Sequence, residues 1–486
     1  MRKPVVGFLV GASLLAVGAA GSLSSTQAAA GTVTFSEHIA PIVYKNCTTC
    51  HHTGEAVPFT LMNYDEVKRH GKTIAAVTER RYMPPWHGAS EMGHFRDERG
   101  LNDNEIRLIR AWVDDGMPSG DLAKAPAAPQ YTDGWRLGTP DLVVRMERPF
   151  EVPASGPDVF RNFAIKLNLK ETKWVRAIDF RPSARVSHHA LFFLDQTGEA
   201  IRLQSQEKES GFSGMSFLGG RGLEALLTRA NASPNEDTSS QNLWGGLGGW
   251  AVGAIAHPLP DGLARPLAAG TDLVLQMHFH PTGKVEREQA TVAFYFADKP
   301  PVKTLSAVQM PPLFGALAGI NLAPGVKDFA IRDTFTVPVD VDVISMGAHA
   351  HYLATHMTLR ATLPGRATRV LASVPKWDFN WQERYTYTEP IRLPKGTRLE
   401  VEIEYDNSVD NPNNPRNPPQ QVWWGQQSFD EMGAMTLELV AANEEDLPEF
   451  RTAVLQHTVQ AVLVGALSGA NAGRGGLRGA RGNRGR

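Results

Sequence analysis

Hydrophobic residues follow two different periods along this chain of 486 residues. In the N-terminal quarter they recur at helical spacing, which predicts helices at residues 34–46, 64–80 and 102–118. From about residue 140, apolar and polar residues alternate in short runs between turn residues, as strands of β-sandwiches do. The clearest predicted strands are residues 174–182, 190–195, 271–279, 290–297, 398–406 and 434–441. The pattern predicts a multidomain protein, with a small all-α domain followed by all-β sandwich domains.

A weak repeat divides the β part into two halves. Residues 266–283 match residues 392–409, and in both an alternating strand follows a Gly-Thr pair. A histidine pair lies upstream of each segment. We therefore expect two copies of one β-sandwich domain, each with its own histidine site. Their predicted bounds are residues 140–295 and 296–450.

The two ends of the chain have distinct compositions. Residues 1–30 begin with Arg2 and Lys3, continue with an apolar run and end in small residues, which predicts a cleaved secretory signal peptide. No later segment has the ~20 apolar residues of a membrane span. Residues 451–486 predict a terminal helix and a disordered Arg/Gly-rich tail. The mature chain is therefore expected to be periplasmic or secreted, without a membrane span.

Composition limits the partners. The formal net charge is −2, so the overall balance does not point to nucleic acid or an anionic membrane. Hydrophobic residues make up 42% of the chain, which is enough to build cores without disulfides. The Ala/Pro-rich residues 122–139 are expected to link the helical domain, residues 31–121, to the β-domains.

The only two cysteines, Cys47 and Cys50, stand directly before His51. A disulfide, a zinc site and a covalent haem could each use such a pair. A disulfide leaves His51 unexplained and zinc needs further ligands, whereas C-x-x-C-H is the attachment motif of c-type haem. His51 would then be one axial ligand of the iron, and Met83 is the expected sixth ligand. His87 competes with Met83 for that role.

Histidine pairs mark the β-domains. His349 and His351 are two apart and can share a face of a strand, as can His278 and His280. His188 and His189 are adjacent, so they can bind one metal only at a strand end or a bulge. Imidazoles combined with a thioether favour copper. Two methionines near the second pair offer that thioether, Met432 and Met435.

In this pattern, residues of about 140–450 resemble the copper type II, ascorbate-dependent monooxygenases, the family of peptidylglycine α-hydroxylating monooxygenase and dopamine β-monooxygenase. The resemblance implies two jelly-roll domains with one copper each. It assigns the first copper to a His-His pair and a later histidine, and the second to an H-x-H pair and a methionine in a "DEM" motif. The matching positions are His188, His189 and His278 for the first site, and His349, His351 and Met432 for the second.

The resemblance also implies an activity. The chain would hydroxylate a C–H bond of a small organic substrate with O₂ at the second copper, while the first copper stores an electron. The fused haem would deliver electrons that ascorbate supplies in relatives, and would itself be reduced by an external donor. The alternative is a non-catalytic periplasmic electron-transfer or copper-binding protein. The amidating enzymes' carboxylate-binding arginine and tyrosine are replaced by Gly347 and Thr436, and His280 has no assigned role.

Overall fold

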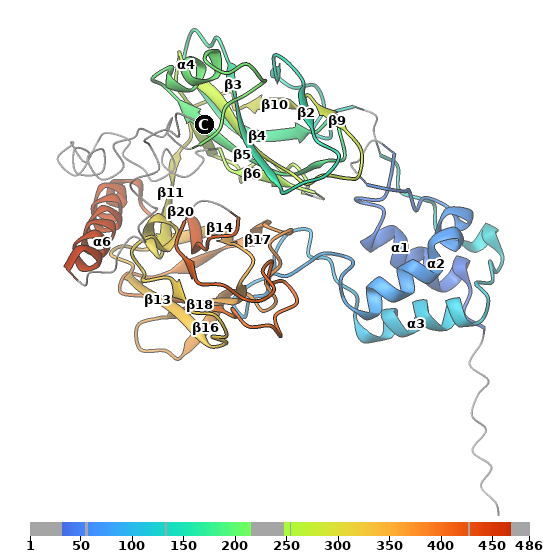
Figure 1. The fold of residues 1–486 in the computed structure, drawn as a ribbon. Coiled ribbons are helices and arrows are strands. Elements are labelled where there is room, and N and C mark those ends of the chain that lie inside the picture. Colours follow the sequence, from blue (N-terminus) through green and yellow to red (C-terminus); the bar gives the residue numbers. More distant parts are fainter. Residues whose placement is uncertain are drawn as a thin grey trace, which may run out of the picture.

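The structure is a computed structural model that describes residues 32–53, 57–131, 134–214, 247–252, 254–425 and 428–467. An N-terminal helical region precedes several antiparallel β-sheets, which confirms the predicted order of all-α and all-β parts (Figure 1). The predicted signal peptide and the Arg/Gly-rich tail lie outside the described residues.

The helical region packs its apolar faces around Trp112, which is 0% exposed. The helices are η1 (Phe35–Ile39), α1 (Ala40–Asn46), α2 (Tyr64–Glu79), α3 (Asp103–Asp114) and the short η2 (Leu122–Lys124). Asn63 caps α2, and Asn102 forms a capping box with Glu105 at the start of α3. All three predicted helices are present, and the first begins as a π-helical turn.

The first β region packs two sheets face to face. Its strands are β1 (Leu142–Arg145), β2 (Phe150–Val152), β3 (Val159–Lys166), β4 (Lys173–Arg181), β5 (Ser187–Asp195), β6 (Gly249–Ala251), β7 (Leu263–Leu267), β8 (Asp272–Phe279), β9 (Glu286–Glu288) and β10 (Thr291–Phe296), with helix α4 (Glu199–Ser205) after β5. The sheet β3-β8-β5-β6 faces strands β1-β10-β4-β7. Phe163, Leu275 and Phe294 meet in the core between them.

The second β region repeats this arrangement. Its elements are β11 (Lys303–Met310), η5 (Pro312–Gly315), β12 (Asn321–Leu322), β13 (Phe329–Thr336), β14 (Val341–Ala350), β15 (Ala354–Thr362), β16 (Thr368–Val374), β17 (Arg384–Leu393), β18 (Arg398–Tyr405), β19 (Val422–Trp423), β20 (Gly433–Ala441), η6 (Glu444–Asp446) and α6 (Leu447–Leu467). The predicted terminal helix therefore starts at Leu447, and its Phe450 is buried in the core of this region.

The predicted repeat is visible in the order of the strands. The sheet β3-β8-β5-β6 corresponds to β13-β18-β15-β16, and strands β1-β10-β4-β7 correspond to β11-β20-β14-β17. The latter two sets form one eight-stranded sheet, because β7 pairs in parallel with β11. Gly270 and Gly396 occupy matching turns with φ of 75° and 83°, a left-handed conformation that glycine adopts without strain. The two halves thus share a sheet rather than standing apart.

Residues 84–99 leave the helices and pack against the second β region (Figure 1). Ala89 forms a bridge to Ser373, and Phe95 forms one to Tyr387. Phe95 is 3% exposed and belongs to the core of that region. The N-terminal part is therefore anchored on the second β region by backbone pairing, while its linker leads to β1 of the first β region.

A buried carboxylate joins the two β regions. Glu438 on β20 accepts an ion pair at 2.5 Å from Arg265 on β7 and another at 2.7 Å from Arg384 on β17. Ser345 donates its hydroxyl to the same carboxylate at 3.0 Å. Burial alone would raise the pKa of Glu438, but the two guanidinium groups outweigh burial and hold this pKa below the ordinary value.

We predict that Glu438→Gln lowers the free energy of unfolding by about 3 kcal/mol, because the buried guanidinium of Arg265 loses its counter-charge. Denaturant titration measures this loss. Glu400→Gln removes a partner from the exposed pair Arg398–Glu400 and should cost less than ~1 kcal/mol. Equal losses in the two variants would contradict the structural role of Glu438.

The same variant should show a pH dependence. Because the folded-state pKa of Glu438 lies below its unfolded value, its contribution is complete above the unfolded pKa of about 4.3 and is lost as the pH falls. The difference in unfolding free energy between the wild type and Glu438→Gln should therefore shrink below about pH 4. A difference that stays constant on acidification would show that Glu438 does not act through its charge.

Candidate metal centres

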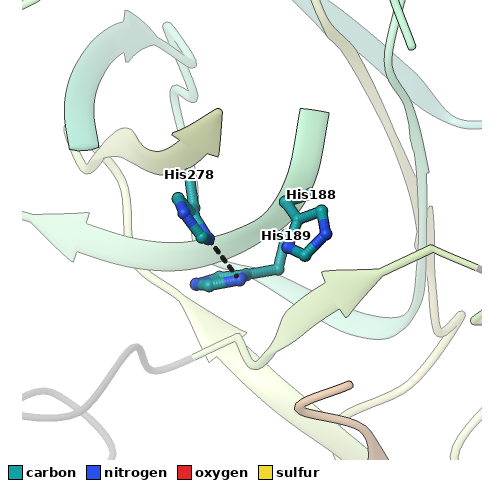
Figure 2. A group of neighbouring side chains, drawn as sticks. All are labelled: His188, His189 and His278. Atoms are coloured by element: carbon teal, nitrogen blue, oxygen red, sulfur yellow. Dashed lines mark hydrogen bonds between the residues drawn. The ribbon is translucent and has the colours of Figure 1, made fainter. Parts of the chain in front are cut away.

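The first histidine set, His188, His189 and His278, comes from two neighbouring strands (Figure 2). His278 on β8 lies directly opposite His189 on β5. The pairing of β5 with β8 shifts register between Ser187 and His189, so His188 is an extra residue in a β-bulge. Adjacent histidines can share a metal only at a strand end or a bulge, and this bulge meets that condition.

The geometry of the first histidine set suits one metal ion. One ring nitrogen of each histidine lies within 4.8 Å of those of the other two. Nδ1 of His278 and Nδ1 of His189 are 3.2 Å apart. The buried Nδ1 of His188 has no hydrogen-bond partner among the described residues, so a donor nitrogen is available there. A buried three-histidine group of this kind could hold one metal ion.

Burial favours the neutral form of two of these imidazoles, His188 and His189. It is the main reason that the pKa of His188 falls to about 4, with His278 adding to the effect. Burial likewise lowers the pKa of His189 well below its ordinary value. Metal binding requires neutral imidazole, so the lowered pKa values of His188 and His189 favour it at neutral pH.

The second histidine set consists of His349, His351 and the neighbouring Met432. His349 is on β14 and His351 directly follows that strand, and their ring centroids are 5.4 Å apart. Ala350 pairs with Gly433 on β20, so His351 and Met432 flank that pair on adjacent strands. One strand pairing therefore brings the backbones of the predicted donors close together.

Other polar groups orient the second histidine set. Gln382 binds Nδ1 of His349 through Oε1 at 2.6 Å, and the backbone carbonyl of Asp430 is 3.0 Å from Nδ1 of His351. The Nε2 atoms are thereby directed away from these contacts. Glu431 accepts from the amides of His351 at 3.0 Å and Met432 at 3.2 Å.

Glu431 is fully enclosed. Burial raises its pKa to about 8, although these amides and that of Leu353 donate to the carboxylate. The carboxylate thus fixes the backbone on both sides of the His351–Met432 pair. This rigid support suits a site whose donors come from two strands.

A cleft of about 320 Å³ is lined by one histidine of each set. His189 lines it from the first β region and His349 from the second. Gly347 and Thr436 also line it, and Arg384 lies opposite Gly347 on β17. The ring of Phe379 lies 5.5 Å from that of His278 and 5.8 Å from that of His351. The two sets therefore face each other across one interface.

Three residues that contact the histidine sets were not predicted from the sequence: Asp158, Phe379 and Gln382. Asp158 contacts Nε2 of His278 at 2.7 Å, and Nδ1 of His280 at 2.8 Å. This assigns a structural partner to His280, whose imidazole is 64% exposed. No motif surrounds any of the three, because each is selected by a contact that forms only in the folded chain.

The C-x-x-C-H segment forms a tight turn after α1. The amide of His51 donates to the carbonyl of Cys47 at 2.9 Å. Nδ1 of His51 lies 2.9 Å from the carbonyl of Phe59, which leaves Nε2 as its metal-binding atom. Burial raises the pKa of Cys47 to about 12, and Cys50 and Glu105 add to the effect.

The two candidate sixth ligands have different surroundings. The amide of Met83 follows α2 and donates to the carbonyl of Val77 at 3.3 Å. His87 lies against Lys376 and Asp378 of the second β region, and burial lowers its pKa. The contacts of His87 thus belong to the junction between the N-terminal part and the β-sheets.

No protein-family model matches the chain, and no curated protein matches it. Among the described residues, no helix is both long and apolar enough to cross a lipid bilayer.

We predict that the first histidine set binds one metal and that His278→Ala releases it. The reason is that His278 is the only member on β8, so its loss leaves two donors from a single strand segment. Elemental analysis after copper loading and desalting measures this. His356→Ala is the control, because His356 bonds to Thr358 Oγ1 at 2.9 Å. Unchanged copper content in His278→Ala would rule out this site.

Proposed function

We propose that the chain is an exported copper-dependent monooxygenase that hydroxylates a C–H bond of a small organic substrate. The observation that carries the proposal is the cleft shared by His189 and His349. Six donor positions match the copper type II monooxygenase pattern in order. A cleft lined by one histidine of each set also favours an enzyme that binds a substrate over a protein that only stores electrons.

The donor chemistry fits copper. When bound, copper would supply the one-electron steps and the O₂ chemistry of such a hydroxylation. A thioether beside two imidazoles, as Met432 stands beside His349 and His351, favours the cuprous state. Gln382 and Glu431 hold these donors, and the ring of Phe379 lies near those of His278 and His351. We propose, as part of the same function, that the two β regions are jelly-roll domains.

We also propose that Cys47 and Cys50 carry a covalent haem with His51 as one axial ligand and Met83 as the other. The turn at residues 47–51 and the hydrogen bond from His51 to Phe59 support this, because ligating histidines commonly donate their other ring N–H to a carbonyl. A periplasmic or secreted location, reached through the signal peptide, is part of this proposal because covalent haem attachment accompanies export.

The packing of residues 84–99 supports internal electron delivery. Nη2 of Arg99 donates to both carboxylate oxygens of Glu383, at 2.9 and 2.8 Å. Glu383 is the chain neighbour of Gln382, which binds His349. The loop at residues 375–383 thus touches the N-terminal part on one side and both histidine sets on the other. A tethered donor has a high effective concentration.

The haem assignment predicts that the wild type retains its haem through denaturing electrophoresis, and that Cys50→Ala loses most of it. Met83→Ala should keep the haem attached but lower its reduction potential, because a thioether ligand raises that potential. His87→Ala is the matched control and should leave the potential unchanged. Two reactive thiols in protein exported by a host that matures c-type cytochromes would end this assignment.

The oxidative function predicts a difference between two methionines. In copper-loaded protein with pre-reduced haem, Met432→Leu should slow oxygen uptake more than ~10-fold, because the thioether is lost. Met435→Leu removes a buried thioether in β20 and should retain uptake. His188→Ala should slow haem reoxidation in stopped flow, since one haem electron cannot complete a two-electron hydroxylation. Copper binding without any oxygen uptake would favour the non-catalytic electron-transfer alternative.

A further inference from the structure

Asp158 lies where the two β regions meet beside the first histidine set. It directly precedes β3, whose Val159 pairs with Phe279 on β8, so Asp158 is held close to His278 and His280. Its side chain is only 13% exposed. Oδ2 is 2.7 Å from Nε2 of His278, and Oδ1 is 2.8 Å from Nδ1 of His280. This carboxylate is therefore an interior group with fixed partners.

The contact with Asp158 determines which nitrogen His278 can offer to a metal. A carboxylate accepts hydrogen bonds, so Nε2 of His278 carries the proton and Nδ1 has the lone pair. Nδ1 is the atom that faces His189 at 3.2 Å. The ring of Phe160 stacks on that of His278 at 4.3 Å and 5°, which fixes the ring plane. Asp158 and Phe160 together aim Nδ1 at the metal position.

A residue of the second β region completes the group. The hydroxyl of Tyr352 donates to Oδ2 of Asp158 at 3.2 Å, which is the same oxygen that His278 uses. Tyr352 is the chain neighbour of His351. Its ring lies 4.3 Å from that of Phe379, which also contacts His278 and His351. One carboxylate thus connects a donor of the first set to the residue beside a donor of the second.

We propose that Asp158 is a positioning residue that couples metal binding at the first histidine set to docking of the second β region through Tyr352. The proposal rests on the proposed function only in requiring that the first set binds copper. When Tyr352 donates to Asp158, the carboxylate is held in the orientation that keeps Nδ1 of His278 facing the metal. When the two β regions separate at this point, the carboxylate is free to rotate and the third donor is less well oriented.

Coupling of this kind is reciprocal. If docking of Tyr352 strengthens metal binding, metal binding must strengthen the docking by the same factor. The coupling can therefore be tested by two measurements. One is the copper affinity of the first histidine set, and the other is the protection of backbone amides around Tyr352 from hydrogen exchange. Neither measurement depends on catalytic turnover.

The test uses the full-length chain with His349 and Met432 replaced by alanine, so that cuprous ions report on the first set alone. Competition with a chromophoric chelator gives the affinity. Asp158→Asn should weaken binding by ~10- to 100-fold, as loss of a partner of a ligating histidine does. Tyr352→Phe touches no ligand and should still weaken it by ~2- to 10-fold, the effect of one hydrogen bond.

The matched control is Tyr387→Phe, which removes a buried hydroxyl of the same β region that donates to the carbonyl of Leu371 at 2.6 Å. It should leave the affinity unchanged. Hydrogen exchange provides the reciprocal measurement: cuprous ions should slow exchange at residues 351–353 when Tyr352 is present and not in Tyr352→Phe. Equal affinities and equal exchange for tyrosine and phenylalanine at 352 would overturn the coupling, even if Asp158→Asn weakened binding.

The two proposals can fail separately. Tight copper binding with the predicted Tyr352→Phe effect, but without oxygen uptake by the wild type, would sink the monooxygenase and support the coupling. Oxygen uptake by the wild type, without an effect of Tyr352→Phe on copper affinity, would support the monooxygenase and overturn the coupling. A first set that takes up no copper would overturn both.

Discussion

The parallel pairing of β7 with β11 joins the two β regions edge to edge, and the candidate site depends on this junction. The pairing is short, with Lys303 opposite Leu263 and Thr304 opposite Ala264. Glu438 reinforces it by binding Arg265 across the boundary. Because both regions continue one sheet, their histidine sets are set at a defined mutual orientation, and the cleft between them has walls from both.

Three carboxylates make the site precise, each in a different way: Glu438 and Glu431 are buried, and Asp158 is half-buried. Glu438 is paired with guanidinium groups, Asp158 with imidazoles and a hydroxyl, and Glu431 with backbone amides. Buried polar groups are costly unless they are satisfied, so each carboxylate favours the one arrangement that satisfies it. Apolar packing alone would tolerate small shifts between the sheets. The carboxylates convert a contact between two β regions into a fixed geometry around the histidines.

The sequence was most informative where structure follows from local pattern. Helical spacing located α2 and α3, and alternation located β4, β8, β18 and β20. The histidines were found because pairs two apart, or adjacent, limit what a strand can do. Asp158 and Tyr352 could not be found in this way, since they meet across 194 positions of chain. The anchoring of residues 84–99 on the second β region was missed for the same reason, because helical spacing describes one element and not its neighbours.

The bulge at His188 shows how a site can be specified by the backbone rather than by residue type. In a regular strand, adjacent side chains point to opposite faces, and a slip of one position would turn the whole strand over. The bulge confines that slip to a single residue, so β5 keeps its core register while two successive imidazoles come near one candidate metal position. Deleting one residue here would therefore leave both histidines in the chain and still separate them onto opposite faces of the sheet. The candidate site therefore depends on the extra backbone residue in β5 as much as on the presence of the histidines.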